Sequence, residues 1–240
     1  MNKIKVAILC GGRGRRLKPL TDELPKPLIP LQNKPILEHI FNFFKTQGFS
    51  EFILCVGYKG HKIIEMVDDY KTNNQGSFVY SDLGENASIL QRIYGLNDKC
   101  NDRLLVTYGD TLTDLAIDNL LREHTIKKTL MTIVASKIRN PFGLIEIGDD
   151  GLAVSFVEKP LSTYYIGHLV MEKKVFSLIT EELLNEPDGK GLVLLFLKLI
   201  EMKTLNVFEH HGCQITFNTE VERINAEKEI IDFYSQKENV

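Results

Sequence analysis

Apolar residues in the first half of the chain recur in two alternating patterns. Short runs rich in β-branched residues, such as KIKVAIL (3–9) and EFILCV (51–56), predict buried strands. Between these runs, PILEHIFNFFKTQGF (35–49) places Ile36, Ile40 and Phe44 on one helical face, and Gly48 can end that helix. The same patterns predict strands at 78–81 and 103–110 and helices at 57–70 and 85–95. Alternation of this kind is typical of an α/β fold with a parallel sheet.

The pattern changes after residue 128, where predicted strands follow one another with little room for helices. These strands are LMTIVAS (130–136), FGLIEI (142–147), AVSFVEKP (153–160) and YYIGHLVME (164–172). A helix near 191–202, a short strand near 206–211 and a terminal helix from Val221 complete the prediction. We expect a single domain over 1–240, with a soft division between 1–128 and a more antiparallel portion over 129–240.

Composition narrows the class of protein. Hydrophobic residues make up 43% and charged residues 25% of the chain, as in ordinary globular proteins, and the net charge of −3 argues against general nucleic-acid binding. The four cysteines form no CxxC pair, which favours free thiols in a reducing compartment. The longest apolar run, GLVLLFLKLI, is too short to span a membrane, and no signal peptide is recognised at MNKIK, so we expect a cytoplasmic protein.

The stretch CGGRGRRLKPLTDELPKPLIP (10–30) combines three glycines, three arginines and four prolines directly after a predicted strand. Glycines let backbone N–H groups approach a ligand closely, and arginines indicate that this ligand is an anion. A Walker-type loop is excluded because no Gly-Lys-Ser/Thr follows. A dinucleotide fingerprint also fails, because Leu17 stands where its third glycine belongs and the strand at 51–56 ends without an acidic residue.

A third pattern fits the same stretch. GGRGRRLKPLT…LPKPLIPLQNKPILEHI resembles the signature GGxGTRLxPLT…PKPLxP of the sugar-1-phosphate nucleotidyltransferase family. The similarity continues in GYKGHKI, YGDT, FGLIEI and VEKP, and GYKGHKI is most similar to the glucose-1-phosphate cytidylyltransferase branch. The resemblance implies a Rossmann-like, mostly parallel sheet flanked by helices, of the nucleotide-diphospho-sugar transferase type. Its nucleotide-binding half would be 1–128 and its sugar-phosphate-binding half 129–240.

The implied reaction joins a sugar phosphate to a nucleoside triphosphate, with Mg²⁺ as cofactor and pyrophosphate as the leaving group. It requires no protein nucleophile or base, only positioning and charge neutralisation. The resemblance assigns catalysis to Arg16, Lys26 and Asp110, with the two cations on the phosphates and Asp110 on the metal. The candidate nucleotide-binding set is Cys10, Gly11, Gly12, Gly14, Arg16, Asp82, Ser88 and Arg92.

The sugar phosphate is assigned to Gly143, Glu158 and Lys159, from FGLIEI and VEKP. For each charged candidate a structural alternative stays open. Asp110 could be a turn or helix-capping residue, and Glu158-Lys159 could simply form a turn before a proline.

The sequence departs from the family pattern at three places. DLGENASILQRI lacks the paired glycines of the cytidylyl branch, so Asp82 could instead cap a helix and Arg92 could be solvated. Asn218, in ITFNT, stands where the family has an aspartate, and is either a second metal ligand without charge or a cap of the terminal helix. Residues 165–167 read Tyr-Ile-Gly where sugar-binding members often have Asn-x-Gly.

The favoured function is therefore synthesis of a nucleotide-activated sugar, most simply a CDP-sugar for surface polysaccharide. Alternatives are another triphosphate, a non-sugar phosphate such as phosphocholine, or a non-catalytic nucleotide-binding regulatory subunit, which Asn218 favours. Expected partners are a nucleoside triphosphate and a sugar phosphate, without nucleic acid or membrane, and the question of a homo-oligomer stays open.

Overall fold

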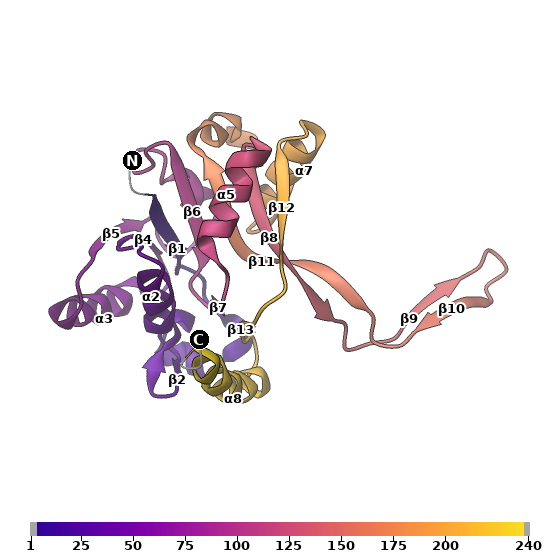
Figure 1. Cartoon of the computed structure of the whole chain (residues 1–240), viewed down its shortest axis with the longest axis horizontal. Coiled ribbons are helices and arrows are strands. Elements are labelled where there is room, and N and C mark those ends of the chain that lie inside the picture. The colour runs from indigo at the N-terminus through magenta and orange to yellow at the C-terminus, as the bar shows by residue number, and fades with distance from the viewer. Residues whose placement is uncertain (1–3, 238–240) are drawn as a thin grey trace.

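The computed structural model describes residues 4–237, so Lys3 of the first predicted strand lies outside it. A seven-stranded sheet forms the centre of the molecule (Figure 1). In spatial order its strands are β12 (Leu205–His210), β8 (Met131–Arg139), β11 (Leu161–Glu172), β6 (Arg103–Tyr108), β1 (Lys5–Leu9), β4 (Glu51–Val56) and β5 (Ser77–Asp82). β11 is antiparallel to both of its neighbours, whereas the other neighbouring strands pair in parallel. The predicted mostly parallel α/β sheet is confirmed.

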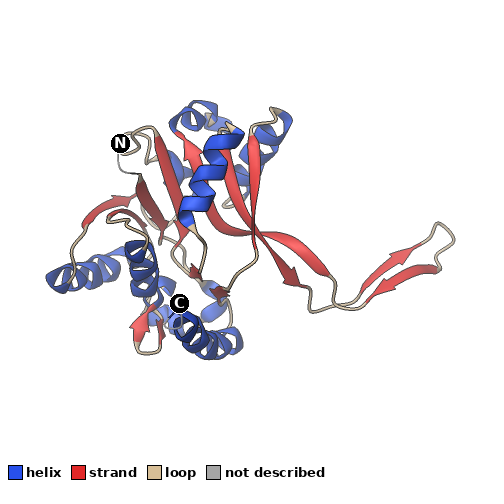
Figure 2. Cartoon of the chain, viewed as in Figure 1, coloured by secondary structure: helices blue, strands red, loops and turns tan. Residues whose placement is uncertain are grey.

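Helices cover both faces of this sheet, as the blue and red elements of Figure 2 show. The longer helices are α2 (Ile36–Thr46), α3 (Gly60–Asn73), α4 (Ile89–Tyr94), α5 (Ile117–Lys127), α7 (Lys190–Glu201) and α8 (Glu220–Lys237). Short helices are α1 (Leu20–Glu23) and α6 (Glu181–Leu184), and 3₁₀ turns form at Arg15–Leu17, Lys26–Leu28 and Lys173–Leu178.

Successive residues of the central strand β1 point to opposite faces, so two hydrophobic cores form. Val6 and Ile8 belong to the core that contains side chains of α2, α3, α5 and α8. Ala7 belongs to the other core, with side chains of α4 and α7. Strands buried on both faces explain why these segments read as continuous apolar runs.

Every predicted strand and helix is present, with ends shifted by a few residues. The sequence pattern predicts no element for residues 111–128, where the structure has β7 (Thr111–Thr113) and α5. The apolar spacing of α5 is interrupted by His124, a polar residue on its buried face. The buried His124 ring forms hydrogen bonds with Thr132 Oγ1 at 2.7 Å and Glu172 Oε1 at 3.0 Å. Both partners lie on strands of the main sheet, β8 and β11.

A long-range strand pair positions the C-terminal segment. β7 pairs in antiparallel fashion with β13 (Gln214–Thr216), and Thr216 Oγ1 donates to the Asp110 carbonyl at 3.0 Å. A small hairpin of β2 (Pro30–Leu31) and β3 (Lys34–Pro35) packs beside α8, where Gln32 N donates to Glu227 Oε1 at 2.7 Å. These contacts bring the segment after β13 to the carboxyl ends of β1 and β6.

Residues 140–160 form an arm that leaves the sheet (Figures 1 and 2). It begins where β8 and β11 cease to pair and consists of β9 (Leu144–Ile147) and β10 (Ala153–Val157), a two-stranded ribbon. Apart from β13, the strands of residues 129–240 thus divide between the main sheet and this ribbon. No helix in the described chain has the length and apolar composition needed to cross a membrane.

Candidate functional site

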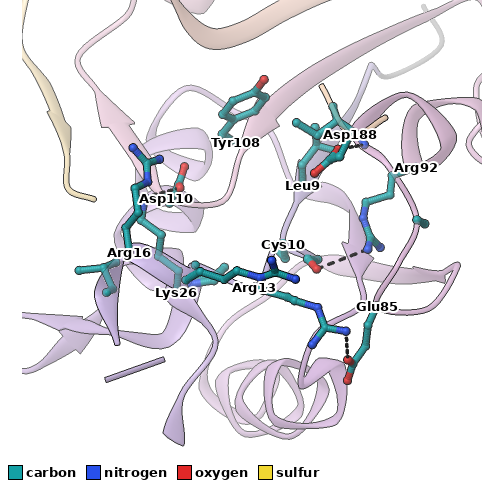
Figure 3. A pocket seen from close by; sticks show the side chains of 18 of the residues that line it. Leu9, Cys10, Arg13, Arg16, Lys26, Glu85, Arg92, Tyr108, Asp110 and Asp188 are labelled. Carbon is teal, nitrogen blue, oxygen red and sulfur yellow. Dashed lines mark hydrogen bonds and ion pairs between the residues drawn. The ribbon is translucent and has the colours of Figure 1, made fainter. Parts of the chain in front are cut away.

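A cavity of about 600 Å³ lies where β1 and β6 end. This is the position at which open α/β sheets bind ligands. Its walls contain five basic side chains against three acidic ones, which suits a polyanion. Figure 3 shows this cavity, whose charged residues are Arg13, Arg15, Arg16, Lys26, Glu85, Arg92, Asp110 and Asp188.

The loop Cys10–Gly14 forms one wall of the cavity. Within the described chain, the N–H groups of Gly11, Gly12 and Gly14 donate to no backbone acceptor. Gly14 has φ +58°, and a Cβ on it would lie 2.9 Å from Thr21 Cγ2, so this position requires glycine. Unpaired amides in a tight loop make a concave anion-binding surface. The buried Cys10 thiol has its pKa raised by burial, so it stays protonated and lines the wall as a small apolar group.

Lys26 lies at the centre of the site, although it is a buried residue between two prolines. Its Nζ lies 2.5 Å from Asp110 Oδ2 and 3.2 Å from Asn218 Oδ1. Arg16 Nη2 donates to the same Asn218 oxygen at 2.9 Å. Segments 84 and 192 residues away from Lys26 therefore converge on one ammonium group (Figure 3 shows Lys26 beside Asp110 and Arg16).

Asn218 does not cap α8 with its side chain. That side chain faces Lys26 and Arg16, while Thr219 Oγ1 accepts from Glu222 N at 3.3 Å. The backbone N–H of Asn218 donates to Glu222 Oε2 at 2.6 Å. The first turn of α8 thus fixes the backbone of Asn218, and the side-chain oxygen of Asn218 faces Lys26 and Arg16 in the cavity.

Arg92 is buried against the back of the glycine loop, with 4% of its surface exposed. Its guanidinium donates to the carbonyls of Val56 (2.5 Å), Gly84 (2.8 Å) and Gly11 (3.4 Å). No carboxylate of the described chain forms an ion pair with it, and burial lowers the pKa of Arg92. Arg92 therefore places a buried positive charge behind the loop, near the carboxylates of Asp188 and Asp82, and is not solvated.

At the other wall, Arg13 forms an ion pair with Glu85 (2.8 Å) and lies over the Tyr58 ring at 5.4 Å. Asp82 Oδ1 accepts from Gly84 N at 2.8 Å, and Ser88 forms a capping box with Gln91. Neither Asp82 nor Ser88 lines the cavity, so their role as nucleotide contacts stays a prediction.

The predicted sugar-phosphate residues lie elsewhere. Gly143, Glu158 and Lys159 belong to the arm, outside the cavity walls. A Cβ on Gly143 would lie 3.3 Å from Glu158 Oε2, so the arm does bring these two positions together. The Lys159 and Glu158 side chains are both more than half exposed, with Nζ 3.9 Å from Oε1. Their role toward a sugar phosphate also stays a prediction.

Several cavity residues are not among the predicted site residues, and two of them, Tyr108 and Asp188, lie on the β6 side of the cavity. Tyr108 ends β6 between Asp110 and Asp188 in the view of Figure 3, and burial, with the nearby Asp110 charge, raises its pKa to about 12. A Cβ on Gly167 would lie 2.8 Å from this ring, so the bulge in β11 places its backbone against Tyr108. Asp188 Oδ1 accepts from Ile89 N at 2.9 Å. Asp188 stands in EPDGKG, which predicts only a turn. Tyr108 lies two residues before Asp110 in YGDT, and this nearness to a predicted metal ligand is a signal that the sequence does contain.

Comparison with known proteins finds relatives that are named for different nucleotides. The chain is 33% identical over 238 residues to a probable glucose-1-phosphate cytidylyltransferase of Bacillus subtilis, covering 90% of this chain and 92% of that one. It is 28% identical to a glucose-1-phosphate cytidylyltransferase of Salmonella typhi, covering 87% and 89%. A Bacillus anthracis crystal structure assigned as a glucose-1-phosphate thymidylyltransferase shares the fold, with a TM-score of 0.75, 24% identity and 94% coverage of both chains. The nucleotidyl transferase family model matches residues 5–194, most of the chain, and this chain is therefore a member of the nucleotidyl transferase family.

Proposed function

We propose that this chain is a Mg²⁺-dependent sugar-1-phosphate cytidylyltransferase, which converts CTP and a sugar 1-phosphate into a CDP-sugar and pyrophosphate. The observation that supports it best is the convergence of Lys26, Asp110, Asn218 and Arg16 beside a loop of unpaired amides. The names of the Bacillus subtilis and Salmonella typhi relatives support the choice of CTP and glucose 1-phosphate. The CDP-sugar would serve surface polysaccharide synthesis.

The chemistry follows from these groups. A phosphate oxygen of the sugar phosphate attacks the α-phosphorus of CTP, the new O–P bond forms, and the bond to the β-phosphate oxygen breaks as pyrophosphate leaves with its electrons. The nucleophile is already anionic, so no side chain has to remove a proton. The amides of Gly11, Gly12 and Gly14 would orient the phosphates, while Lys26 and Arg16 would offset the charge that develops in the transition state. Arg92 would add charge from behind the loop.

The oxygen donors at this site fit a hard divalent cation. Asp110 Oδ2 and Asn218 Oδ1 already lie within 3.2 Å of one cationic atom, Lys26 Nζ. Mg²⁺ prefers one or two carboxylates completed by phosphate oxygens and water, and in the described chain no group of three His, Cys, Asp or Glu residues forms a metal cage. When bound, Mg²⁺ would neutralise phosphate charge and align the reacting groups. Asp110 and Asn218 would hold it.

Other triphosphates are the competing substrates, because the Bacillus anthracis structure is assigned to a thymidylyltransferase. Asn218 in place of a carboxylate is the observation that favours a second candidate function, a nucleotide-binding regulatory chain. Such a chain would bind a triphosphate without releasing pyrophosphate. A non-sugar phosphate acceptor is the remaining alternative.

Pyrophosphate release tests the proposal, with CTP, UTP, dTTP and GTP each paired with a panel of phosphorylated sugars and alcohols. CTP with a sugar 1-phosphate should give the highest kcat/KM. A clear preference for another triphosphate would overturn the cytidylyl assignment, and binding without turnover would support the regulatory chain.

A matched pair of variants connects that activity to the cavity. Lys26→Ala should lower kcat by about 10²-fold or more, because charge stabilisation in the transition state is lost. Lys18→Ala is the control, since Lys18 lies in the same loop region but pairs with Asp22 outside the cavity. Equal rates for the two variants would contradict the assignment of Lys26.

A further inference from the structure

The cavity extends beyond the charged residues that converge on Lys26. In Figure 3, Asp188 lies beside Leu9, on the opposite side of the cavity from Arg16 and Lys26. Cys10, at the start of the glycine loop, lies between these two sides. A triphosphate held by the amides of this loop and by Lys26 would therefore direct its nucleoside toward Asp188. This step rests on the proposed function, because it requires a nucleoside triphosphate as the ligand.

The walls on the Asp188 side suit the faces of a nucleobase. Leu9, at the end of β1, lies beside Asp188, and Ile89 contacts Asp188 through its backbone N–H. Ala87, two residues before Ile89, also lines the cavity. Apolar walls with a few polar groups are the usual composition of a site for a small organic ligand. Apolar walls bind the faces of any base, so the choice among bases depends on the polar groups beside them.

Two carboxylates lie near these walls, and they differ in their partners. Glu85 Oε2 pairs with Arg13 Nη2 at 2.8 Å. Asp188 is exposed and forms no ion pair within residues 4–237. Its Oδ1 accepts from Ile89 N at 2.9 Å, whereas its Oδ2 accepts no hydrogen bond from the described chain. One oxygen of Asp188 is therefore fixed by the backbone, and the other is available to a ligand.

Nucleobases differ in what they present to a carboxylate oxygen. Cytosine and adenine have an exocyclic amino group, which donates a hydrogen bond, whereas uracil and thymine have the O4 carbonyl, which a carboxylate repels. Guanine has two adjacent donors, N1 and N2, which match a carboxylate with both oxygens available. Because Oδ1 already accepts from Ile89, Asp188 offers one free acceptor and favours a base with a single amino donor.

We propose that Asp188 Oδ2 accepts a hydrogen bond from the N4 amino group of cytosine and thereby selects CTP over UTP and dTTP. The bond from Ile89 N orients the carboxylate before the nucleotide binds, which lowers the cost of ordering this side chain. Adenine also has an exocyclic amino group, so ATP is the competing ligand of the same chemistry.

Asp188→Asn tests the role of this one oxygen. The amide oxygen of the new side chain replaces Oδ1 and accepts from Ile89 N, so the amide nitrogen takes the place of Oδ2 and donates. A donor at this position favours O4 of uracil over the amino group of cytosine. Calorimetric titration of the full chain with CTP, UTP and ATP, without an acceptor phosphate, measures the affinities. The ratio of CTP affinity to UTP affinity should fall by about 10–100-fold.

Glu186→Gln is the matched control for loss of a carboxylate. Glu186 lies two residues before Asp188 and pairs with Lys190 at 2.8 Å, outside the cavity walls. This variant should leave the ratio of CTP to UTP affinity unchanged. Asp188→Ala removes both oxygens and should reduce the ratio without reversing the preference.

An unchanged ratio in Asp188→Asn would overturn the proposal, as would tighter binding of ATP than of CTP by wild type. Weaker binding of the acceptor phosphate with an unchanged ratio would also overturn it, because Asp188 would then contact the acceptor and not the base. The titrations require no turnover, so they separate this inference from the proposed function. If wild type releases no pyrophosphate, the proposed enzyme activity fails, while a lower ratio in Asp188→Asn still supports the role of Asp188. Tighter binding of UTP or dTTP than of CTP by wild type would overturn both.

Discussion

Adding one methyl group at Gly11 should destabilise the protein through Arg92. A Cβ on Gly11 would lie 2.7 Å from Arg92 Nε and closer still to Cζ, so the guanidinium must move. Arg92 cannot move freely, because it is buried and donates to the carbonyls of Val56 and Gly84 at 2.5 and 2.8 Å. Hydrogen bonds from a charged group contribute about 1.5–3 kcal/mol each. Weakening both should reduce the free energy of unfolding by about 2–4 kcal/mol.

Gly12→Ala is the matched control, because nothing lies within 4 Å of its added Cβ. This change should leave the free energy of unfolding within about 1 kcal/mol of wild type, or raise it slightly by restricting the unfolded chain. For a chain of this length, 1 kcal/mol corresponds to about 2–4 °C in Tm. Gly11→Ala should therefore lower Tm by about 5–15 °C, measured by thermal and urea unfolding without ligand.

The double variant identifies the cause. Arg92→Ala leaves carbonyls unpaired and is destabilising by itself, but it also removes the group that the new methyl would displace. In that background, Gly11→Ala should cost less than about 0.5 kcal/mol, which gives a coupling energy of about 2 kcal/mol. Equal stability of the Gly11 and Gly12 variants would show that the added methyl group does not displace Arg92. So would an undiminished cost of Gly11→Ala when Arg92 is absent.

Three further outcomes are expected. Asp110→Ala should abolish Mg²⁺-dependent turnover, measured by pyrophosphate release, and should also lower Tm because the buried Lys26 loses its carboxylate partner. Near-normal turnover would place the metal elsewhere. Asn218→Asp should lower the Mg²⁺ concentration for half-maximal rate by up to about tenfold, since a charged ligand binds the ion more tightly, whereas the remote Asn119→Asp should not. Burial, aided by nearby His210, lowers the pKa of His168 to about 3. Between pH 6.5 and 3 the unfolded chain therefore binds one proton more than the folded chain, and the free energy of unfolding decreases as the pH is lowered. His168→Gln should reduce that slope by up to about 1.4 kcal/mol per pH unit, and an unchanged slope of the urea-derived free energy would contradict this.

Local patterns were sufficient for most elements of the fold. Alternating strand and helix periods predicted β1, β4, β5 and β6 and the helices α2, α3 and α4 between them, because burial on both faces of a parallel sheet leaves a continuous apolar run. α5 was missed because the buried His124 takes an apolar position and is paired only through tertiary contacts. Likewise, the sequence left open a solvated Arg92, because the carbonyl groups that accept its hydrogen bonds lie in other segments of the chain.

The chemistry of the opening loop follows from local sequence. Glycines at 11, 12 and 14 and the prolines around Lys26 act on their own backbone dihedrals, within a few residues, so they can be recognised without a structure. Which distant groups meet that loop depends on long-range contacts. The pairing of β7 with β13 brings Asn218 to Lys26 across 192 residues, and departure of the arm from the sheet separates Glu158 and Lys159 from the cavity. Whether two segments meet depends on strand register and on which surface covers an apolar face. Both are properties of long-range contacts that no local pattern encodes.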